Sequence, residues 1–133
     1  MKTAIFFLMV LFTNPTIEDE KEAISTTLNY YMNGGTNRSF ETLKKAFHPE
    51  AIMTINNEEG LKQVNARDFF SKMKQGDPLK RTCKIVSIDI EGTTAIARLH
   101  LEDDKKIFHD FMTLLKVDGN WLIVNKSYYT EYK

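Results

Sequence analysis

The side chains of this 133-residue sequence that could do chemistry lie mostly near its C-terminal end. His109 is followed directly by Asp110, a pair that could form a dyad in which the carboxylate orients the imidazole. The surrounding residues predict a β-strand, and adjacent strand residues point to opposite faces of the sheet. The two side chains therefore cannot meet within one chain, which leaves His109 as a lone pocket base or as a half-buried histidine bonded to a neighbour.

Lys126 is the second candidate, because an ammonium group on the wall of an apolar pocket would attract an anionic or carbonyl ligand. Equally, it could pair with a carboxylate of a helix or protect a sheet edge from aggregation. Tyr31 and Phe47 fall at positions that would face the core. Aromatic side chains there usually only fill space, although the hydroxyl of Tyr31 could reach a ligand.

The composition argues against several functional classes. Eighteen Lys and Arg residues balance eighteen Asp and Glu residues, so the chain has neither the positive charge of a nucleic-acid-binding protein nor a polybasic membrane patch. The single cysteine, Cys83, excludes a disulfide within the chain. The three histidines do not have a recognised metal-site spacing, and no glycine-rich phosphate loop is present, so neither a metal nor a cofactor is predicted.

The N-terminal residues 1–15 are set apart from the predicted domain over 16–133. Lys2 precedes an apolar run from Ala4 to Phe12, which has the shape of a secretory signal but lacks an Ala-x-Ala cleavage site. The run is shorter than the roughly 20 residues that span a membrane. We therefore expect a periplasmic or secreted protein without stable membrane insertion after processing. Otherwise the segment packs on a cytoplasmic domain as a strand or helical turn.

Periodic apolar residues predict three helices, all in the first half of the domain. Thr16 and Asp19 form a capping-box pattern at the start of the first helix, and Gly34 is expected to end it. The predicted elements of this half are a helix over 16–33, a helix capped by Asn37 that ends before Pro49, a strand over 51–55, a turn over 56–60 and a helix capped by Asn65.

The second half predicts a meander of four strands over 79–90, 93–102, 106–117 and 120–129. Asp118-Gly119 between the last two is a strong hairpin signal. The strand over 93–102 alternates apolar and polar residues, with Ala95, Ala97, Leu99 and Leu101 facing inward, whereas the strand over 106–117 is apolar on both faces. We therefore expect an α+β domain in which the helices cover one face of the sheet and a second copy of the chain covers the other.

The stretches "YYMNGG", "FETLKKAFHPEA" and "FMTLLKVDGNWLIVNKSYY" resemble the nuclear transport factor 2-like superfamily, and within it most closely the putative lumazine-binding family of small bacterial proteins. The resemblance covers residues 16–133. It implies a cone-shaped domain with three N-terminal helices packed on a curved, mainly antiparallel sheet. It also implies a deep pocket between the helices and the sheet, and homodimers that form through the outer face of the sheet.

The hairpin register then assigns candidate sites. A two-residue turn at Asp118-Gly119 pairs Val117 with Asn120, and counting back places Thr113 opposite Val124. By analogy with superfamily enzymes, one hairpin face is assigned to the pocket and the other to the dimer, and a register error of one residue would exchange them. The predicted ligand-binding residues are Tyr31, Phe47, His109, Phe111, Lys126 and Tyr128, and the predicted dimer interface contains Phe108, Met112, Leu114, Trp121 and Ile123.

Catalytic carboxylates are not evident in this pattern. Aligned through "HPEA", the general-base aspartate of ketosteroid-isomerase-like relatives falls near Ile55, and no second carboxylate is predicted on the inner face of the hairpin. We therefore expect a noncatalytic domain that binds a small hydrophobic or anionic molecule. One alternative is an isomerase, dehydratase or cyclase with His109 or Lys126 as its base and Tyr31 as its proton donor. Another is a protein-interaction scaffold whose pocket is filled by its own side chains.

Overall fold

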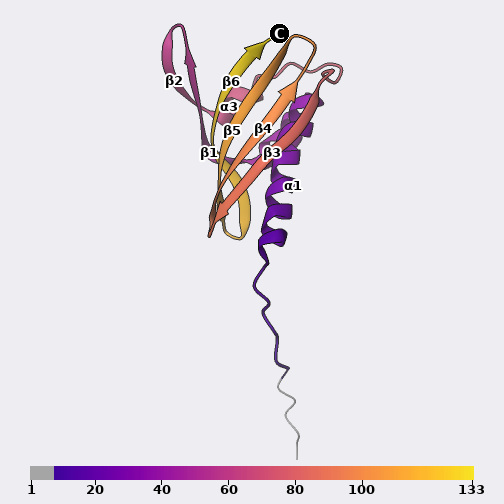
Figure 1. Ribbon diagram of the computed structural model, residues 1–133, viewed down its shortest axis with the longest axis vertical. Helices are drawn as coiled ribbons and strands as arrows, with labels where there is room; N and C mark the ends of the chain where they lie inside the picture. The colour runs from indigo at the N-terminus through magenta and orange to yellow at the C-terminus, as the bar shows by residue number, and fades with distance from the viewer. Residues whose placement is uncertain (1–7) are drawn as a thin grey trace, which may run out of the picture.

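Helices cover one face of a six-stranded sheet in the computed structural model, which describes residues 8–133 (Figure 1). The strand order is β2-β1-β6-β5-β4-β3, and every neighbouring pair is antiparallel except β1 and β6. The predicted α+β class and mainly antiparallel sheet are confirmed. The elements are α1 (Ile17–Thr36), α2 (Phe40–Leu43), the 3-10 turn η1 (Lys44–Ala46), β1 (Phe47–Asn57), β2 (Gly60–Asn65), α3 (Ala66–Ser71), β3 (Thr82–Glu91), β4 (Thr94–Glu102), β5 (Lys106–Val117) and β6 (Asn120–Tyr132).

Helix α1 starts as predicted but ends later. The Thr16 hydroxyl accepts the backbone N–H of Asp19, and the Asp19 carboxylate accepts that of Thr16, which completes the capping box. Gly34 does not stop the helix, which continues to Thr36. A Cβ atom on Gly34 would lie 2.5 Å from the backbone nitrogen of Leu43. The glycine is therefore needed for the close packing of α2 on α1.

The segment between α1 and β3 contains less helix and more strand than predicted. Ser39, not Asn37, caps α2, whose Thr42 N–H donates to the Ser39 hydroxyl at 3.2 Å. The chain enters β1 before Pro49, so this proline lies within a strand. Because proline has no N–H, it fits the interruption of the β1–β6 ladder between Phe47 and Ile52. Strand β2, which the sequence analysis missed, pairs with β1 as a hairpin.

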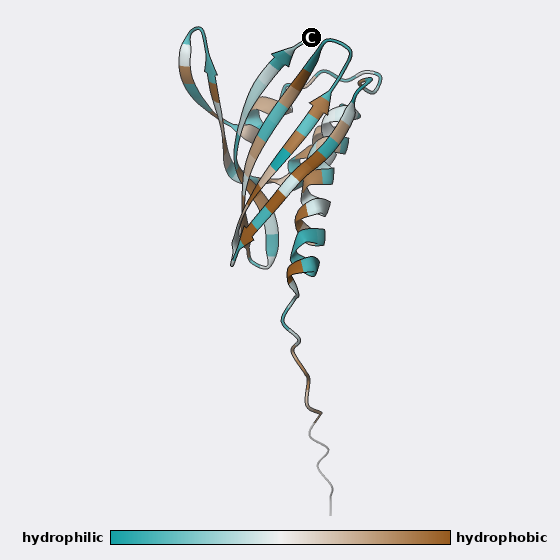
Figure 2. Ribbon diagram, in the orientation of Figure 1, coloured by the Kyte–Doolittle hydropathy of each residue, from teal (hydrophilic) through white to brown (hydrophobic). Residues whose placement is uncertain are grey.

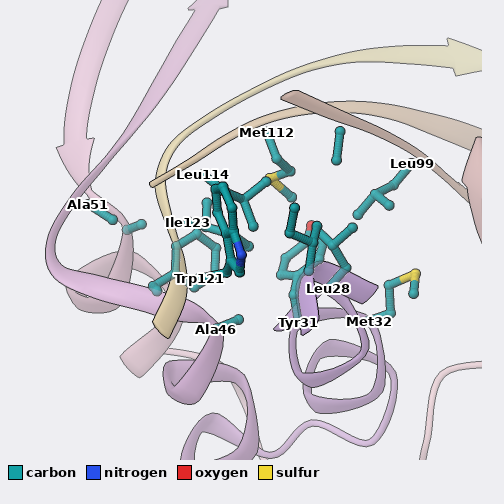
Figure 3. Packing of buried hydrophobic residues seen from close by; sticks show 14 of the residues in the cluster. Leu28, Tyr31, Met32, Ala46, Ala51, Leu99, Met112, Leu114, Trp121 and Ile123 are labelled. Carbon is teal, nitrogen blue, oxygen red and sulfur yellow. The ribbon is translucent and has the colours of Figure 1, made fainter. Parts of the chain in front are cut away.

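The hydrophobic core lies between α1, the short helices and the inner face of the sheet (Figure 3). Ala95, Ala97, Leu99 and Leu101 of β4 are buried, as their alternation predicted. Figure 2 shows the corresponding change between apolar and polar residues along the strands.

A single bulge in β6 changes which residues of that strand face the inside of the domain. Asp118 and Gly119 have φ angles of 50° and 81°, as a tight hairpin turn requires, and Val117 pairs with Asn120 as predicted. The count from the turn is correct as far as the pair of Leu114 with Ile123. Thr113 then pairs with Asn125 instead of Val124, because Val124 is an extra residue in β6.

The predicted dimer interface is wrong, because the two faces of β5, and of β6 up to the bulge, were exchanged. Met112, Leu114 and Ile123 are fully buried inside the chain, and Trp121 is 3% exposed. Side chains already enclosed by their own core cannot contact a second copy. Phe108 is half-buried on the same inner face.

The described part of the N-terminal segment, residues 8–16, forms neither helix nor strand. The side chains of Leu8 to Phe12 are exposed, so this part does not pack on the domain as a strand or helical turn. Residues 1–7, which complete the predicted signal-like segment, lie outside the described residues. Within residues 8–133, no helix is long and apolar enough to cross a membrane.

Candidate functional site

An inner cavity of about 200 Å³ lies between the helices and the concave face of the sheet. It adjoins a larger outer hollow of about 520 Å³, and the two share Tyr31, Phe69, Phe70 and Arg81. Most of the lining of the inner cavity is apolar, and the remainder consists of three charged side chains and two tyrosines. The inner cavity is lined by Tyr31, Met53, Phe69, Phe70, Arg81, Leu101, Phe108, Asp110, Lys126 and Tyr128.

A buried carboxylate, Asp110 of β5, organises the polar part of this cavity. One of its oxygens accepts a hydrogen bond from the Tyr31 hydroxyl at 2.6 Å, and the other accepts one from the Lys126 ammonium at 2.7 Å. Asp110 is 1% exposed and Lys126 is 3% exposed. We call these three residues the inner cluster. Buried charges are retained in proteins when they are paired and hydrogen-bonded in this way.

Burial changes the proton affinity of two members of the inner cluster. It raises the pKa of the Tyr31 hydroxyl well above its usual value of 10.0, and the negative charge of Asp110 adds to this effect. Burial also lowers the pKa of Lys126 from its usual 10.5, while Asp110 opposes the shift. Tyr31 therefore keeps its proton at neutral pH, and Lys126 gives up a proton more readily than a lysine in water.

The ammonium of Lys126 has unused hydrogen-bonding capacity. Among residues 8–133 its one hydrogen bond is to Asp110, whereas an ammonium has three donors. Its nitrogen lies 4.4 Å from the centre of the Tyr128 ring and 5.7 Å from that of Tyr31. Aromatic faces stabilise a cation but do not replace a hydrogen-bond acceptor. A ligand oxygen in the cavity would supply one.

A second cation, Arg81, stands where the cavity meets the outer hollow. Its Nε–H donates to the hydroxyl of Thr36 at 2.9 Å, which fixes the side chain to the end of α1. Fixing the guanidinium by one nitrogen leaves its terminal N–H groups able to bind a carboxylate. Lys126 therefore lies at the deep end of the inner cavity, and Arg81 lies at its mouth.

The structure brings together three of the six predicted ligand-binding residues. Tyr31, Lys126 and Tyr128 line the cavity. Phe47 is fully buried behind it, where its ring meets that of Tyr31 edge-on at 5.8 Å, so it supports Tyr31 without lining the cavity. Lys126 and Tyr128 face inward although β5 was assigned the wrong face, because the bulge at Val124 reverses the alternation of β6.

His109 and Phe111 lie on the opposite, outer face of the sheet, so their placement in the pocket is wrong. The His109 Nδ1 is 3.0 Å from the Nε2 of His100, and its Nε2 is 2.7 Å from a carboxylate oxygen of Glu131. We call His100, His109 and Glu131 the outer cluster. Phe111 is 43% exposed and lies beneath the guanidinium of Arg98.

Asp110 is the principal residue that the sequence analysis placed wrongly. The prediction that His109 faces the pocket puts the adjacent Asp110 on the dimer face. In the structure Asp110 is buried on the inner face, so the expectation that this face of the hairpin lacks a carboxylate is wrong. The neighbouring strand held the missing signal. Leu99 is inward by its clear alternation, and cross-strand partners share a face, so its partner Asp110 must also be inward.

Within residues 8–133, no group of three or more His, Cys, Asp or Glu side chains is arranged to hold a metal ion.

The family relationship agrees with this architecture. The sequence pattern of the family described as putative lumazine-binding matches residues 19–129. The chain belongs to this family. The solved structures that resemble it include nuclear transport factor 2-like proteins, which places the family's fold in that superfamily.

Two solved structures and one curated protein show how similar the relatives are. A nuclear transport factor 2-like protein of unknown function from Shewanella baltica is 31% identical, with a TM-score of 0.81 over 89% of this chain and 98% of its own. One from Methylobacillus flagellatus is 30% identical, with a TM-score of 0.76 over 89% of this chain and 96% of its own. The curated protein, aldolase FrzH of Cladobotryum sp., is 26% identical over an alignment of 116 residues that covers 84% of this chain and 91% of FrzH.

Proposed function

We propose that this protein binds a small molecule with a carbonyl or carboxylate oxygen in the inner cavity. The observation that carries the proposal is the Lys126 ammonium, which is buried on an aromatic wall and makes one hydrogen bond among the described residues. A ligand oxygen would accept from its remaining donors, and the Phe and Tyr side chains would enclose the apolar part of the ligand.

The size of the cavity limits the occupant. About 200 Å³ is below the roughly 300–1,000 Å³ of common ligand sites, so the inner cavity admits a compact molecule or the reactive end of a longer one. A longer ligand would extend past Arg81 into the outer hollow. Arg81 would then bind an anionic group at that end.

A binding experiment tests this proposal directly. Calorimetric titration with benzaldehyde, cyclohexanone, benzoate and phenylpyruvate should show saturable binding of at least one compound. Benzyl alcohol and cyclohexanol should bind more weakly, because a hydroxyl is a poorer acceptor for an ammonium group. Lys126→Met should remove the preference for the carbonyl or carboxylate, whereas Lys84→Met, at an exposed position of β3, should not. Equal binding by wild type and Lys126→Met would contradict the proposal.

A second candidate function is an enzyme that forms an enolate from a carbonyl substrate. Asp110 is a carboxylate inside an apolar cavity, where it could take a proton from the carbon next to a carbonyl group held by Lys126. The relative named as an aldolase supports this candidate, because aldol reactions proceed through such a species. Exchange of the α-hydrogens of cyclohexanone with D₂O, followed by NMR, would test it. Exchange no faster than in buffer would contradict it.

We also propose that a second copy of the chain covers the outer face of the sheet. Ile96, Phe111, Leu115 and Tyr129 expose apolar surface there. Exposed apolar patches of this kind are typical of association surfaces. A change of Phe111 to Glu should convert a dimer to a monomer in analytical ultracentrifugation, and a wild-type protein that is monomeric at micromolar concentration would contradict the proposal.

Export remains a prediction. The exposed apolar side chains from Leu8 to Phe12 are compatible with a segment that is removed before the domain functions. Mass spectrometry of the protein purified from its native cells would test this, since an intact N-terminal segment on the functional protein would contradict export by cleavage.

A further inference from the structure

We propose that Lys126 binds its carbonyl ligand covalently, as an imine between its side-chain nitrogen and the carbonyl carbon of an aldehyde or ketone. This inference rests on the proposed function, because the ligand must first occupy the inner cavity. It narrows the ligand to uncharged carbonyl compounds and identifies the Lys126 nitrogen as a nucleophile. The geometry that points to it is a lysine nitrogen on the wall of an apolar cavity, with a carboxylate 2.7 Å away and a tyrosine hydroxyl beyond that carboxylate.

Lysine is a useful nucleophile only when part of its population is uncharged at neutral pH. An apolar, desolvated surrounding favours the neutral amine, and burial lowers the pKa of Lys126 in this way. Asp110 opposes the shift but also provides a base within hydrogen-bonding distance of the ammonium. The proton that leaves the nitrogen therefore has an acceptor inside the site, where water has little access.

The atoms and charges of the step balance within the inner cluster. Asp110 takes one proton from the ammonium, the nitrogen lone pair attacks the carbonyl carbon, and Asp110 passes that proton to the carbonyl oxygen, which becomes a hydroxyl. Asp110 then takes a second proton from the nitrogen, which restores the lone pair, and gives it to the hydroxyl. The hydroxyl leaves as water while the nitrogen lone pair forms the C=N bond. The overall change is ammonium plus carbonyl to protonated imine plus water.

The electrostatics of the cavity suit this product. The protonated imine keeps one positive charge and one N–H, so it retains the ion pair with Asp110 and adds no charge to the buried site. Tyr31 holds the other oxygen of Asp110 at 2.6 Å and keeps its own proton, which fixes the carboxylate beside the reacting nitrogen. The nearby Tyr128 ring, 4.4 Å from the nitrogen, provides a flat wall for a planar imine.

Reductive trapping tests the proposal on the full chain. The protein is incubated at pH 7 with benzaldehyde or cyclohexanone and sodium cyanoborohydride, whose hydride converts the imine to a stable secondary amine. Peptide mass mapping then locates the adduct. We expect modification at Lys126 at least tenfold faster than at exposed lysines such as Lys74 and Lys84, which are internal controls in the same sample. Benzyl alcohol and cyclohexanol should give no adduct.

Two variants test whether Lys126 reacts because of its surroundings and not merely because a carbonyl compound can reach it. Asp110→Asn should slow trapping at Lys126 at least tenfold without changing the exposed lysines. Lys126→Arg keeps the cation but forms no stable imine, so it should bind the carbonyl compound and give no adduct at position 126. Should either variant fail to fold, the comparison of lysines within the wild-type protein still decides the question.

The outcomes distinguish this inference from the proposed function. Saturable binding of benzaldehyde or cyclohexanone in calorimetry, with adducts only on exposed lysines, would overturn the imine and leave noncovalent binding intact. Absence of both saturable binding and a Lys126 adduct for every carbonyl and carboxylate probe would overturn both.

Discussion

Two polar clusters lie back to back on strand β5 and come from adjacent residues. Asp110 belongs to the inner cluster with Tyr31 and Lys126, and His109 belongs to the outer cluster with His100 and Glu131. Each is a chain of three side chains joined by two hydrogen bonds of 2.6–3.0 Å. They differ in burial, since the side chain of the central Asp110 is 1% exposed, whereas that of the central His109 is 21% exposed and that of Glu131 is 52% exposed.

Similar hydrogen bonds therefore have different consequences on the two sides of one strand. On the inner side, the three side chains are buried, so each depends on the others for its hydrogen bonds, and burial shifts the pKa of Tyr31 and of Lys126. On the outer side, water competes for the bond between His109 and Glu131 and screens their charges. We therefore expect ligand chemistry from the inner cluster and mainly surface interactions from the outer one.

The largest effect should come from removing the shared carboxylate. Asp110→Ala leaves Lys126 buried without its ionic partner, and breaking a buried pair in this way costs about 3–5 kcal/mol of the free energy of unfolding. Urea denaturation followed by circular dichroism would measure the loss. His109→Ala, at the next residue but on the outer face, is the matched control and should cost less than about 1 kcal/mol. Equal losses in the two variants would contradict the distinction between the faces.

The fold could be predicted from the sequence more completely than the site. The apolar alternation of Ala95, Ala97 and Leu99 and the turn at Asp118-Gly119 are local patterns, and both were read correctly. The bulge at Val124 has no such local signal, and it lies in a strand that pairs with both β1 and β5. Strand β5 is apolar on both faces and gave no internal signal for which face was inward.

Burial of Asp110 illustrates the same limit. The analogy with superfamily enzymes gave the face of Asp110 to the dimer, and nothing in the sequence of β5 opposed this, since carboxylates are rarely buried without a partner. Its partners, Tyr31 and Lys126, are 79 and 16 residues away in the sequence. The interaction that permits burial is visible only after the fold has brought the three together.

Removing the tyrosine hydroxyl should have the second-largest effect. Tyr31→Phe keeps the ring contacts with Phe47 and Phe70 but removes the hydrogen bond to Asp110. Hydrogen bonds to charged groups contribute about 1.5–3 kcal/mol, and we expect a loss in this range in urea denaturation. Tyr129→Phe, an exposed tyrosine on the outer face, is the control and should be nearly neutral. A neutral Tyr31→Phe would mean that water or a ligand takes over the bond.

Glu20 is intermediate in burial between the inner and outer clusters, and its carboxylate should make the stability of the fold depend on pH. Its carboxylate accepts hydrogen bonds from the Lys116 ammonium and from the Trp121 indole N–H. These bonds lower the pKa of Glu20 below the usual 4.5, and the bond from Lys116 has the larger effect. The folded state therefore keeps the carboxylate ionised at pH values where the unfolded chain takes up a proton. The stabilisation is fully present above pH 4.5 and is lost as the pH falls through the lower pKa of the folded state.

Glu20→Gln should consequently flatten the acid side of the curve of unfolding free energy against pH. Thermal unfolding between pH 3 and 7 would measure this, with Glu18→Gln as a control for the loss of one negative charge on the same helix turn. A slope below pH 4.5 that is as steep in Glu20→Gln as in wild type would contradict the role of this carboxylate.

The smallest effect is expected in the outer cluster and depends on what covers it. A double-mutant cycle with His109→Ala and Glu131→Gln should give a coupling free energy below about 1 kcal/mol in dilute protein, since the pair is exposed to solvent and salt. If a second copy covers this face, the coupling should rise with protein concentration, because association removes the competing water. A coupling that stays small at concentrations where ultracentrifugation detects dimers would place the dimer contact elsewhere. A coupling already as large as that between Tyr31 and Asp110 in the monomer would remove the contrast between the two clusters.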